Sequence, residues 1–360
     1  MGFYPYDSPA APDVTSHRQT DEFARPRPFD GMRAMRDPRH TTDSRLLLAA
    51  AQAGDERAFR ELVEPYRHAL EVHCYRMLGS LDESEDLVQE TLLRAWRALE
   101  RFEPRAQLQT WLYRIATNAC LDELERRPRR PEPLDPFPDL ALDETAAATY
   151  DPAARYALRE GMELALLRAI QELPGRQRAV LIFRDVLGWT APEVAELLDT
   201  TGASVNSALQ RARATIDAQL PGPTAPASAP AGPAERALLD RYVDAFEHDD
   251  VEGLVALLRE DAMLRMPPQP SVVGPRAIAR FFRETAAGGD LSRLRLEPTR
   301  ANGLLAVRIY RRADDGSLAP HGISVLEIED GQIVAIEAFI RPALLRRFGF
   351  TADERSGRSP

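Results

Sequence analysis

Residues 80–99 read SLDESEDLVQETLLRAWRAL, and this stretch decides how the first part of the chain folds. Ser80 followed three residues later by Glu83 is the pattern of a capping box, and the neighbouring acids suit the positive N-terminal end of a helix. Four apolar residues recur at helical spacing on one face: Val88, Leu92, Ala95 and Leu99. We therefore predict an amphipathic helix that begins here and buries this face.

A second face of the same helix carries Asp86, Gln89, Glu90 and Leu93, at positions i, i+3, i+4 and i+7. This face is acidic with one apolar residue, a combination that suits a partner presenting arginines. A face that is merely solvated is the alternative if the helix stands alone. Ahead of it, the apolar period of residues 44–78 predicts two or three further helices, and Gly79 is expected to end the last of them.

The segments CYRMLGSLDESEDLVQETLLRAWRAL (74–99) and TWLYRIATNACLDELERR (110–127) follow each other at a short separation. In this order they resemble domain two of sigma-70 type transcription initiation factors, specifically the extracytoplasmic-function group. The resemblance covers residues 44–127. It implies that Asp86, Gln89, Glu90 and Leu93 bind core RNA polymerase and that the following segment melts and holds the minus-ten promoter element.

The residues that the resemblance assigns to minus-ten DNA are Arg105, Gln107, Gln109, Thr110, Trp111, Arg114 and Asn118. We expect the first three to lie in a loop, where stacking and base-edge hydrogen bonds read single-stranded DNA. Trp111 shares a helical face with Ile115 and Ala119, so a place in the hydrophobic core is an equal alternative for it.

Residues 190–220 have helix-turn-helix spacing, because Thr190 and Glu193 can cap a short helix and residues 199–201 can form the turn. In the second helix we expect four residues to face inward: Val205, Leu209, Ala212 and Ile216. No acid occurs in residues 202–215, as expected of a helix that lies against phosphates. The stretch resembles sigma domain four, which implies minus-thirty-five DNA binding by Ala203, Asn206, Ser207, Gln210, Arg211 and Arg213. A helical hairpin that only packs is the alternative.

Beyond a Pro/Ala linker, PGPTAPASAPAGP, the pattern changes to helices followed by strands at 291–298, 304–311, 323–328 and 333–340, with a turn at Asp330-Gly331. The segments MPPQP, GPRAIARFF, ANGLLAVRIY and RFGF resemble the SnoaL-like domain, an α+β cone with a curved antiparallel sheet. The segment PALLRRFGF (342–350) is expected to dock on its own cone, with docking on the acidic sigma surface as the alternative.

Such cones often enclose an apolar pocket, so a small-molecule sensor or a cyclase-like or isomerase-like enzyme is the competing function. Its titratable candidates are Asp261, His321, Glu327 and Glu337. Acids that alternate with apolar residues more often mark the solvent face of a strand. We therefore predict a protein that is not an enzyme, and no catalytic residue is assigned.

The chain has 360 residues and a net charge of −10, so any DNA-binding surface must be local. Cys74 and Cys120 lie among apolar neighbours and indicate neither a disulfide nor a metal site, and no cofactor is indicated. The first residues lack the basic start and apolar core that are typical of a signal peptide, and no apolar run is long enough to span a bilayer, so we predict a cytoplasmic protein without a membrane partner.

Together these patterns predict a multidomain protein with two all-α sigma domains and an α+β cone. The predicted segments are a disordered extension (1–40), domain two (41–127), an acidic, extended Pro-rich linker (128–154), domain four (155–220), a Pro/Ala linker (221–233), the SnoaL-like domain (234–350) and a tail (351–360). The expected function is promoter-specific transcription initiation with core RNA polymerase and promoter DNA as partners. The cone is expected to act as a built-in regulator through intramolecular contact with the sigma domains. A helical adaptor that only binds polymerase, and a small-molecule ligand of the cone, remain alternatives.

Overall fold

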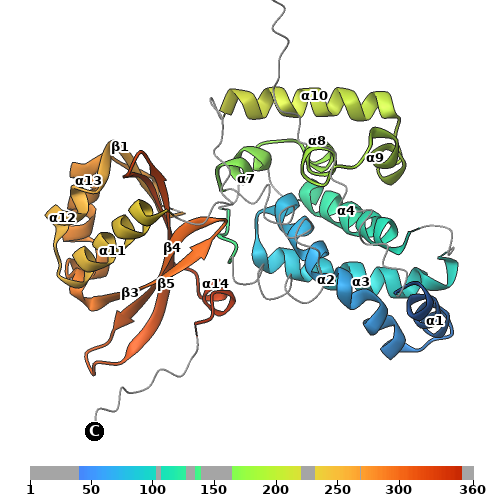
Figure 1. The fold of residues 1–360 in the computed structure, drawn as a ribbon, viewed down its shortest axis with the longest axis horizontal. Helices are drawn as coiled ribbons and strands as arrows, with labels where there is room; N and C mark the ends of the chain where they lie inside the picture. Colours follow the sequence, from blue (N-terminus) through green and yellow to red (C-terminus); the bar gives the residue numbers. More distant parts are fainter. Residues whose placement is uncertain are drawn as a thin grey trace, which may run out of the picture.

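The computed structural model describes residues 40–102, 107–126, 134–138, 164–219, 232–267 and 269–350. The extension predicted to be disordered and the tail after residue 350 lie essentially outside these ranges. A helical half and a sheet-containing half lie side by side, with the short helix α14 between them (Figure 1). Among the described helices, none is both long and apolar enough to cross a bilayer.

The first helical module consists of α1 (His40–Gln52), α2 (Glu56–Leu78), α3 (Leu81–Ala98), the 3-10 turn η2 (Leu99–Arg101) and α4 (Leu108–Arg126). Helix α2 ends at Gly79, whose φ of +78° is left-handed, as the sequence predicts. A side chain at this position would meet Leu134 at 3.0 Å and Gln171 at 3.1 Å. The glycine therefore also allows two distant segments to approach the end of α2.

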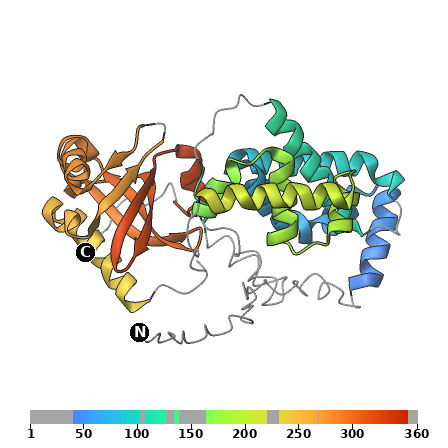
Figure 2. The same ribbon diagram turned by 90° about the horizontal axis from the view of Figure 1, so that it is seen from above.

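The second helical module consists of α7 (Leu164–Gln171), α8 (Gly175–Leu181), the π-helical turn η3 (Ile182–Val186), α9 (Ala191–Leu197) and α10 (Gly202–Gln219). Seen from above, α10 runs along the outside of the helical half (Figure 2). Buried residues of both modules belong to one hydrophobic cluster, which joins Leu70, Leu112 and Cys120 to Ile182 and Phe183. The two modules thus share a core in this conformation.

The third module begins with α11 (Pro233–Glu247) and α12 (Val251–Val255), continues through β1 (Leu258–Arg265), β2 (Val272–Val273), α13 (Pro275–Glu284), η4 (Ala286–Gly288) and η5 (Leu291–Arg293), and ends with β3 (Leu294–Ala301), β4 (Leu304–Arg312), β5 (Leu318–Glu329), β6 (Gln332–Phe339) and α14 (Pro342–Arg347). The strand order is β2-β1-β6-β5-β4-β3. Strands β1 and β6 are parallel, so the sheet is mixed rather than wholly antiparallel as predicted. The crossover from β1 brings the last strand beside the first.

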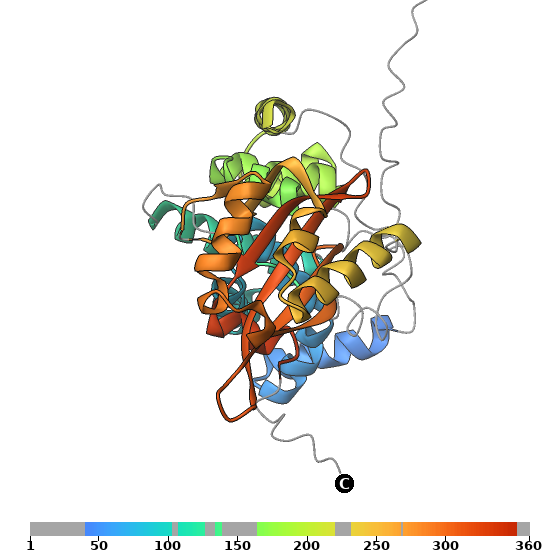
Figure 3. The same cartoon turned by 90° about the vertical axis from the view of Figure 1, so that its left-hand side faces the viewer.

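Helices α11, α12 and α13 cover one face of this curved sheet (Figure 3). The opposite face contacts α14, the linker residues Leu134 and Phe137, and Tyr75 of α2 in a separate hydrophobic cluster. Residues 134–138 of the predicted acidic linker form no helix, and all five are buried. Leu134 and Phe137 supply the apolar surface that makes this burial favourable.

Candidate polymerase-binding and nucleic-acid interfaces

The predicted acidic face of α3 lies on the surface. Asp86 and Gln89 are exposed, Leu93 is 51% exposed and Glu90 is partly exposed. Glu90 accepts a hydrogen bond from Arg94 at 2.8 Å, and this bond lowers the pKa of the Glu90 carboxyl. On the opposite face Val88, Ala95 and Leu99 are buried and Leu92 is partly buried, as the spacing predicts. A partner can therefore reach the acidic face without disturbing the core.

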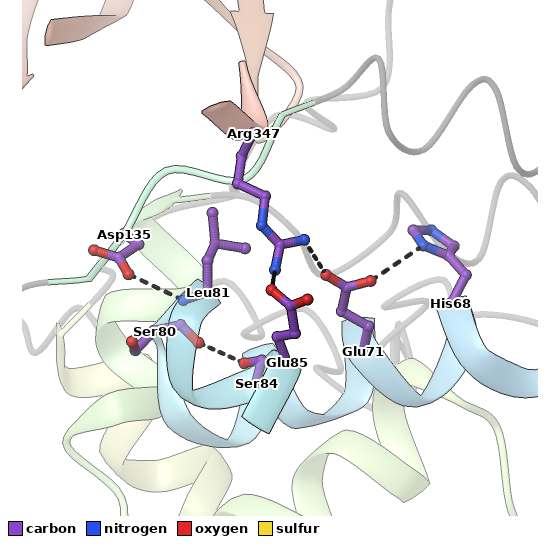
Figure 4. A network of polar contacts seen from close by, with 8 residues as sticks. All are labelled: His68, Glu71, Ser80, Leu81, Ser84, Glu85, Asp135 and Arg347. Carbon is purple, nitrogen blue, oxygen red and sulfur yellow. Dashed lines mark hydrogen bonds and ion pairs between the residues drawn. The ribbon is translucent and has the colours of Figure 1, made fainter. Parts of the chain in front are cut away.

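The beginning of α3 differs from the prediction. Ser80 is the N-cap residue, but its side chain makes no capping hydrogen bond, so the predicted capping box with Glu83 is wrong. The free amide of Leu81 instead donates to Oδ2 of Asp135 at 2.9 Å, while Oγ of Ser84 donates to the Ser80 carbonyl at 2.5 Å (Figure 4). A residue 54 positions later in the chain thus caps this helix.

The predicted minus-ten residues are only partly brought together. Gln109, Thr110, Trp111, Arg114 and Asn118 belong to α4, Gln107 directly precedes it, and Arg105 lies outside the described residues. Gln109 was expected in a loop but occupies the first turn of the helix. Gln107, Arg114 and Asn118 are exposed, whereas Gln109 and Thr110 are half-buried.

Trp111 is half-buried, and its ring centroid lies 4.8 Å from that of Phe102. It packs against the shared core, so this environment agrees with the packing alternative and leaves its contact with DNA a prediction.

The helix-turn-helix forms as its spacing predicts. Thr190 and Glu193 make a capping box at the start of α9, and the turn contains Asp199 with a left-handed φ of +54°. Val205, Leu209 and Ala212 of α10 are buried, and Ile216 is partly buried. The six predicted DNA-facing residues are all exposed: Ala203, Asn206, Ser207, Gln210, Arg211 and Arg213.

Two arginines of this set have partners within the protein. Arg213 forms a bidentate pair with Asp185, at 2.8 and 2.6 Å, and Arg211 donates to the Ser207 hydroxyl at 2.8 Å. Arg213 must therefore leave or share Asp185 to contact a base. Gln210, which directly precedes Arg211, is exposed.

The seam between the two helical modules is centred on Arg178 of α8, which is 5% exposed. Its guanidinium donates to the Met77 carbonyl at the end of α2, to the side chain and carbonyl of Gln171 at 2.6 and 2.5 Å, and to the Leu173 carbonyl at 3.1 Å. The side chain of Gln171 donates to the Arg76 carbonyl at 3.1 Å. These bonds satisfy backbone acceptors at helix ends, where carbonyls lack intrahelical partners.

Other contacts across this seam are aromatic and ionic. The ring of His73 of α2 packs against those of Tyr113 and Phe183, at centroid distances of 5.1 and 5.0 Å. Burial, reinforced by nearby Arg76, lowers the pKa of His73 to about 3. Arg114 of α4 lies 3.7 Å from Asp199 in the helix-turn-helix. Both predicted DNA-binding helices therefore belong to one compact unit.

The third module contacts the first through the segment 134–138 and through α14. Asn302 lies in the turn after β3. Its side-chain oxygen accepts a hydrogen bond from the backbone amide of Phe137 at 2.8 Å, and its backbone amide donates to the Phe137 carbonyl at 2.9 Å. Arg341 pairs with Asp135. Arg347 pairs with Glu71 at 2.7 Å and also with Glu85, one residue before the acidic face (Figure 4).

The segment 342–350 therefore makes both of the contacts that the sequence offered. Leu344, Phe348 and Phe350 pack on their own sheet, and Tyr310 lies 4.9 Å from Phe350 between ring centroids. Arg347 reaches across to the first helical module. The apolar side chains dock on the cone while the charged one bridges the modules.

The titratable candidates of the cone do not share one site. Asp261 is exposed and pairs with Arg259 at 2.5 Å, and His321 is half-buried. Glu327 and Glu337 pair with Arg168 of α7 at 3.0 and 2.6 Å, and Glu337 also with Arg265 at 2.5 Å. Burial raises the pKa of Glu337, and the two arginines oppose this rise.

Glu337 is paired in register with Val325, whose side chain belongs to the cluster facing the helical half. Its sequence neighbours Ile336 and Ala338 face α11, α12 and α13 instead. The buried carboxylate of Glu337 therefore lies at the junction between α7 and the sheet, where two arginines balance its charge.

Comparison with known proteins agrees with this architecture. Residues 62–130 match the family model of sigma-70 region 2, residues 163–216 match sigma-70 region 4, and residues 239–336 match the SnoaL-like domain. The ECF RNA polymerase sigma factor SigG of Mycobacterium tuberculosis is 40% identical over 323 residues, an alignment that covers 83% of this chain and 86% of SigG. The chain belongs to the ECF sigma factor family. We refer below to its region 2, region 4 and SnoaL-like domain.

Two further relatives delimit the modules of this ECF sigma factor. SigW of Bacillus subtilis is 30% identical over 180 residues, which cover 46% of this chain but 91% of SigW. Nearly the whole length of SigW thus aligns with about half of this chain. The crystal structure of SigJ of Mycobacterium tuberculosis covers 80% of this chain and 98% of its own, with a TM-score of 0.56 and 22% identity, and shares the fold.

Several junction residues were missed by the sequence reading: Asp135, Arg168, Arg178 and Arg341. Leu134 and Phe137 provided a usable signal, because apolar residues within an acidic, proline-rich linker indicate a segment that packs. The arginines gave no comparable local signal.

Proposed function

We propose that this chain directs core RNA polymerase to specific promoters, with α3 binding polymerase, α4 binding the minus-ten element and α10 binding the minus-thirty-five element. The observation that carries the proposal is the exposed face of Asp86, Gln89, Glu90 and Leu93, formed over a buried apolar face in region 2 of an ECF sigma factor. Promoter-dependent run-off transcription with reconstituted holoenzyme tests it. A helical adaptor would bind polymerase but give no promoter-dependent transcript. A cytoplasmic location stays a prediction.

Engaging both promoter elements requires the two helical regions to separate. Elements centred roughly 25 base pairs apart lie about 85 Å apart along B-DNA. Here Arg114 and Asp199, from the two DNA-binding units, are 3.7 Å apart. The 37 residues between α4 and α7 (127–163) can span about 125 Å when extended, so the linker is long enough for this separation.

Gln210→Ala is expected to weaken binding to the cognate upstream element by about 1 to 3 kcal/mol, the range for a lost base-edge contact. Gln210 is exposed near the middle of α10, where an amide can bond bidentately to adenine. Fluorescence anisotropy with cognate and scrambled duplexes across salt concentrations measures the effect. A loss that is equal on all DNA, with a salt slope reduced by about one, would assign Gln210 to phosphate instead.

The SnoaL-like domain is proposed to act as a built-in regulator rather than as an enzyme. It contacts region 2 through Arg347, the linker through Arg341 and region 4 through Glu327 and Glu337, so it touches both regions that initiation uses. Among its titratable candidates, the two glutamates have roles at this junction.

Deletion of residues 221–360 is expected to change transcription from the cognate promoter several-fold while promoter choice stays the same. SigW, whose length is almost wholly matched by about half of this chain, is a precedent for a sigma factor of this size. The full-length variant Arg347→Glu is the control, because it retains the SnoaL-like domain and its apolar surface but weakens its docking. Glu71 and Glu85 would repel the new carboxylate. Equal activity of all three proteins across promoters and salt would favour the sensor or enzyme alternative.

A further inference from the structure

Asp135 connects the SnoaL-like domain to the first turn of α3. Its backbone amide donates to the Gly79 carbonyl at 2.8 Å, and its own carbonyl accepts from the Tyr75 hydroxyl at 2.5 Å. One carboxylate oxygen accepts from the Leu81 amide, and the other pairs with Arg341. The segment thus ties together the end of α2, the start of α3 and the SnoaL-like domain. Figure 4 shows its bond to the start of α3.

The carboxylate depends on the SnoaL-like domain for its charge partner. The side chain of Asp135 is 0% exposed, and burial raises the pKa of this carboxyl while the Leu81 amide and Arg341 oppose the rise. Without Arg341 the carboxylate would be buried with the Leu81 hydrogen bond as its main stabilisation. An ionised carboxylate in that situation favours leaving the site for water.

The docked domain acts at the start of α3 and leaves the face beyond it open. Arg347 forms an ion pair with Glu85, whereas Asp86, Gln89 and Leu93 stay exposed. In this arrangement the domain does not compete with a partner for these three side chains. It holds the helix that presents them.

We propose that Asp135 is a positioning residue for polymerase binding: the docked SnoaL-like domain keeps its carboxylate in place as the acceptor that caps the Leu81 amide at the start of α3, and this raises the affinity for core RNA polymerase. The proposal rests on the proposed function of α3. It adds the direction of the domain's effect: loss of docking should lower the affinity for polymerase. N-terminal amides that lose their acceptor fray the first turn of α3, residues 81–84, which leads directly into Glu85 and Asp86.

The test uses full-length protein and three variants. Asp135→Ala removes both the cap and the ion pair, Asp135→Asn keeps an equivalent capping acceptor but not the charge, and Arg341→Gln removes only the cation. Hydrogen exchange of residues 80–90 reports the cap, and titration of labelled sigma factor with core polymerase reports affinity. Asp261→Ala is the matched control, since Asp261 is exposed and paired within the SnoaL-like domain.

Asp135→Ala is expected to lower both protection of the first turn of α3 and polymerase affinity by about fivefold, whereas Asp135→Asn stays within about twofold of the parent in both. Arg341→Gln should weaken affinity in the parent but add nothing in the Asp135→Ala background, because its effect passes through Asp135.

The proposal is overturned if Asp135→Ala loses protection but binds polymerase normally, if Asp135→Asn falls as far as Asp135→Ala, or if the Arg341→Gln loss is fully additive. Failure of the proposed function is recognised separately. In that case charge reversal at Asp86 would leave polymerase binding intact, whatever happens at Asp135.

Discussion

The double variant Asp86→Arg, Glu90→Arg is expected to weaken binding to core RNA polymerase by at least about 100-fold, or roughly 3 kcal/mol. Each substitution replaces attraction to a basic partner by repulsion. Neither side chain contributes to the buried face of α3, and the only paired one, Glu90, bonds to partly exposed Arg94, a contact of small value to stability. The loss should therefore appear in binding and not in the thermal unfolding of the free protein.

Co-purification with core enzyme and equilibrium titration measure this loss. The matched control is Glu61→Arg, Glu64→Arg, which makes the same change in charge at exposed positions of α2. If the α3 variant binds as tightly as this control, polymerase does not use the acidic face and the assignment of α3 is wrong.

Arg178→Ala is expected to destabilise the closed arrangement of regions 2 and 4 by about 3 kcal/mol. The substitution leaves the carbonyls of Met77, Gln171 and Leu173 without a buried donor and removes a large side chain from a packed seam. Charged donors to carbonyls contribute more than neutral ones, and these acceptors lie at helix ends.

Urea unfolding of the parent and the variant measures the change in the free energy of unfolding. The rate at which Cys74 and Cys120 react with a thiol reagent reports opening of the seam. Both thiols are free and fully buried, and Arg178 lies close enough to Cys120 to affect its pKa. The control Arg176→Ala changes an exposed arginine of the same helix. Thiol reactivity that rises equally in both variants, or in neither, would show that Arg178 does not hold the seam.

The sequence alone determined the elements and the modules. The apolar period of Val88, Ala95 and Leu99 fixed the buried face of α3, since a helix with one apolar face has one way to bury it. The same local logic placed the end of α2 at Gly79 and the inward residues of α10. Because the apolar face of α3 is buried, its acidic face had to be exposed. Family resemblance supplied the functions of these surfaces, which their periodicity could not.

Only the tertiary structure decided what the modules do to one another. Local patterning predicted a capping box of Ser80 and Glu83 at the start of α3, but Asp135 accepts the hydrogen bond of the Leu81 amide instead. The linker residues Leu134 and Phe137 pack between region 2 and the sheet and so bring this carboxylate to the helix start. Likewise nothing around Arg168 or Arg178 in the chain reveals Glu337 or the Met77 carbonyl as a partner. Local capping and amphipathic burial depend on neighbours within a few residues, whereas these contacts join groups 54 or more residues apart and exist only once the modules have packed.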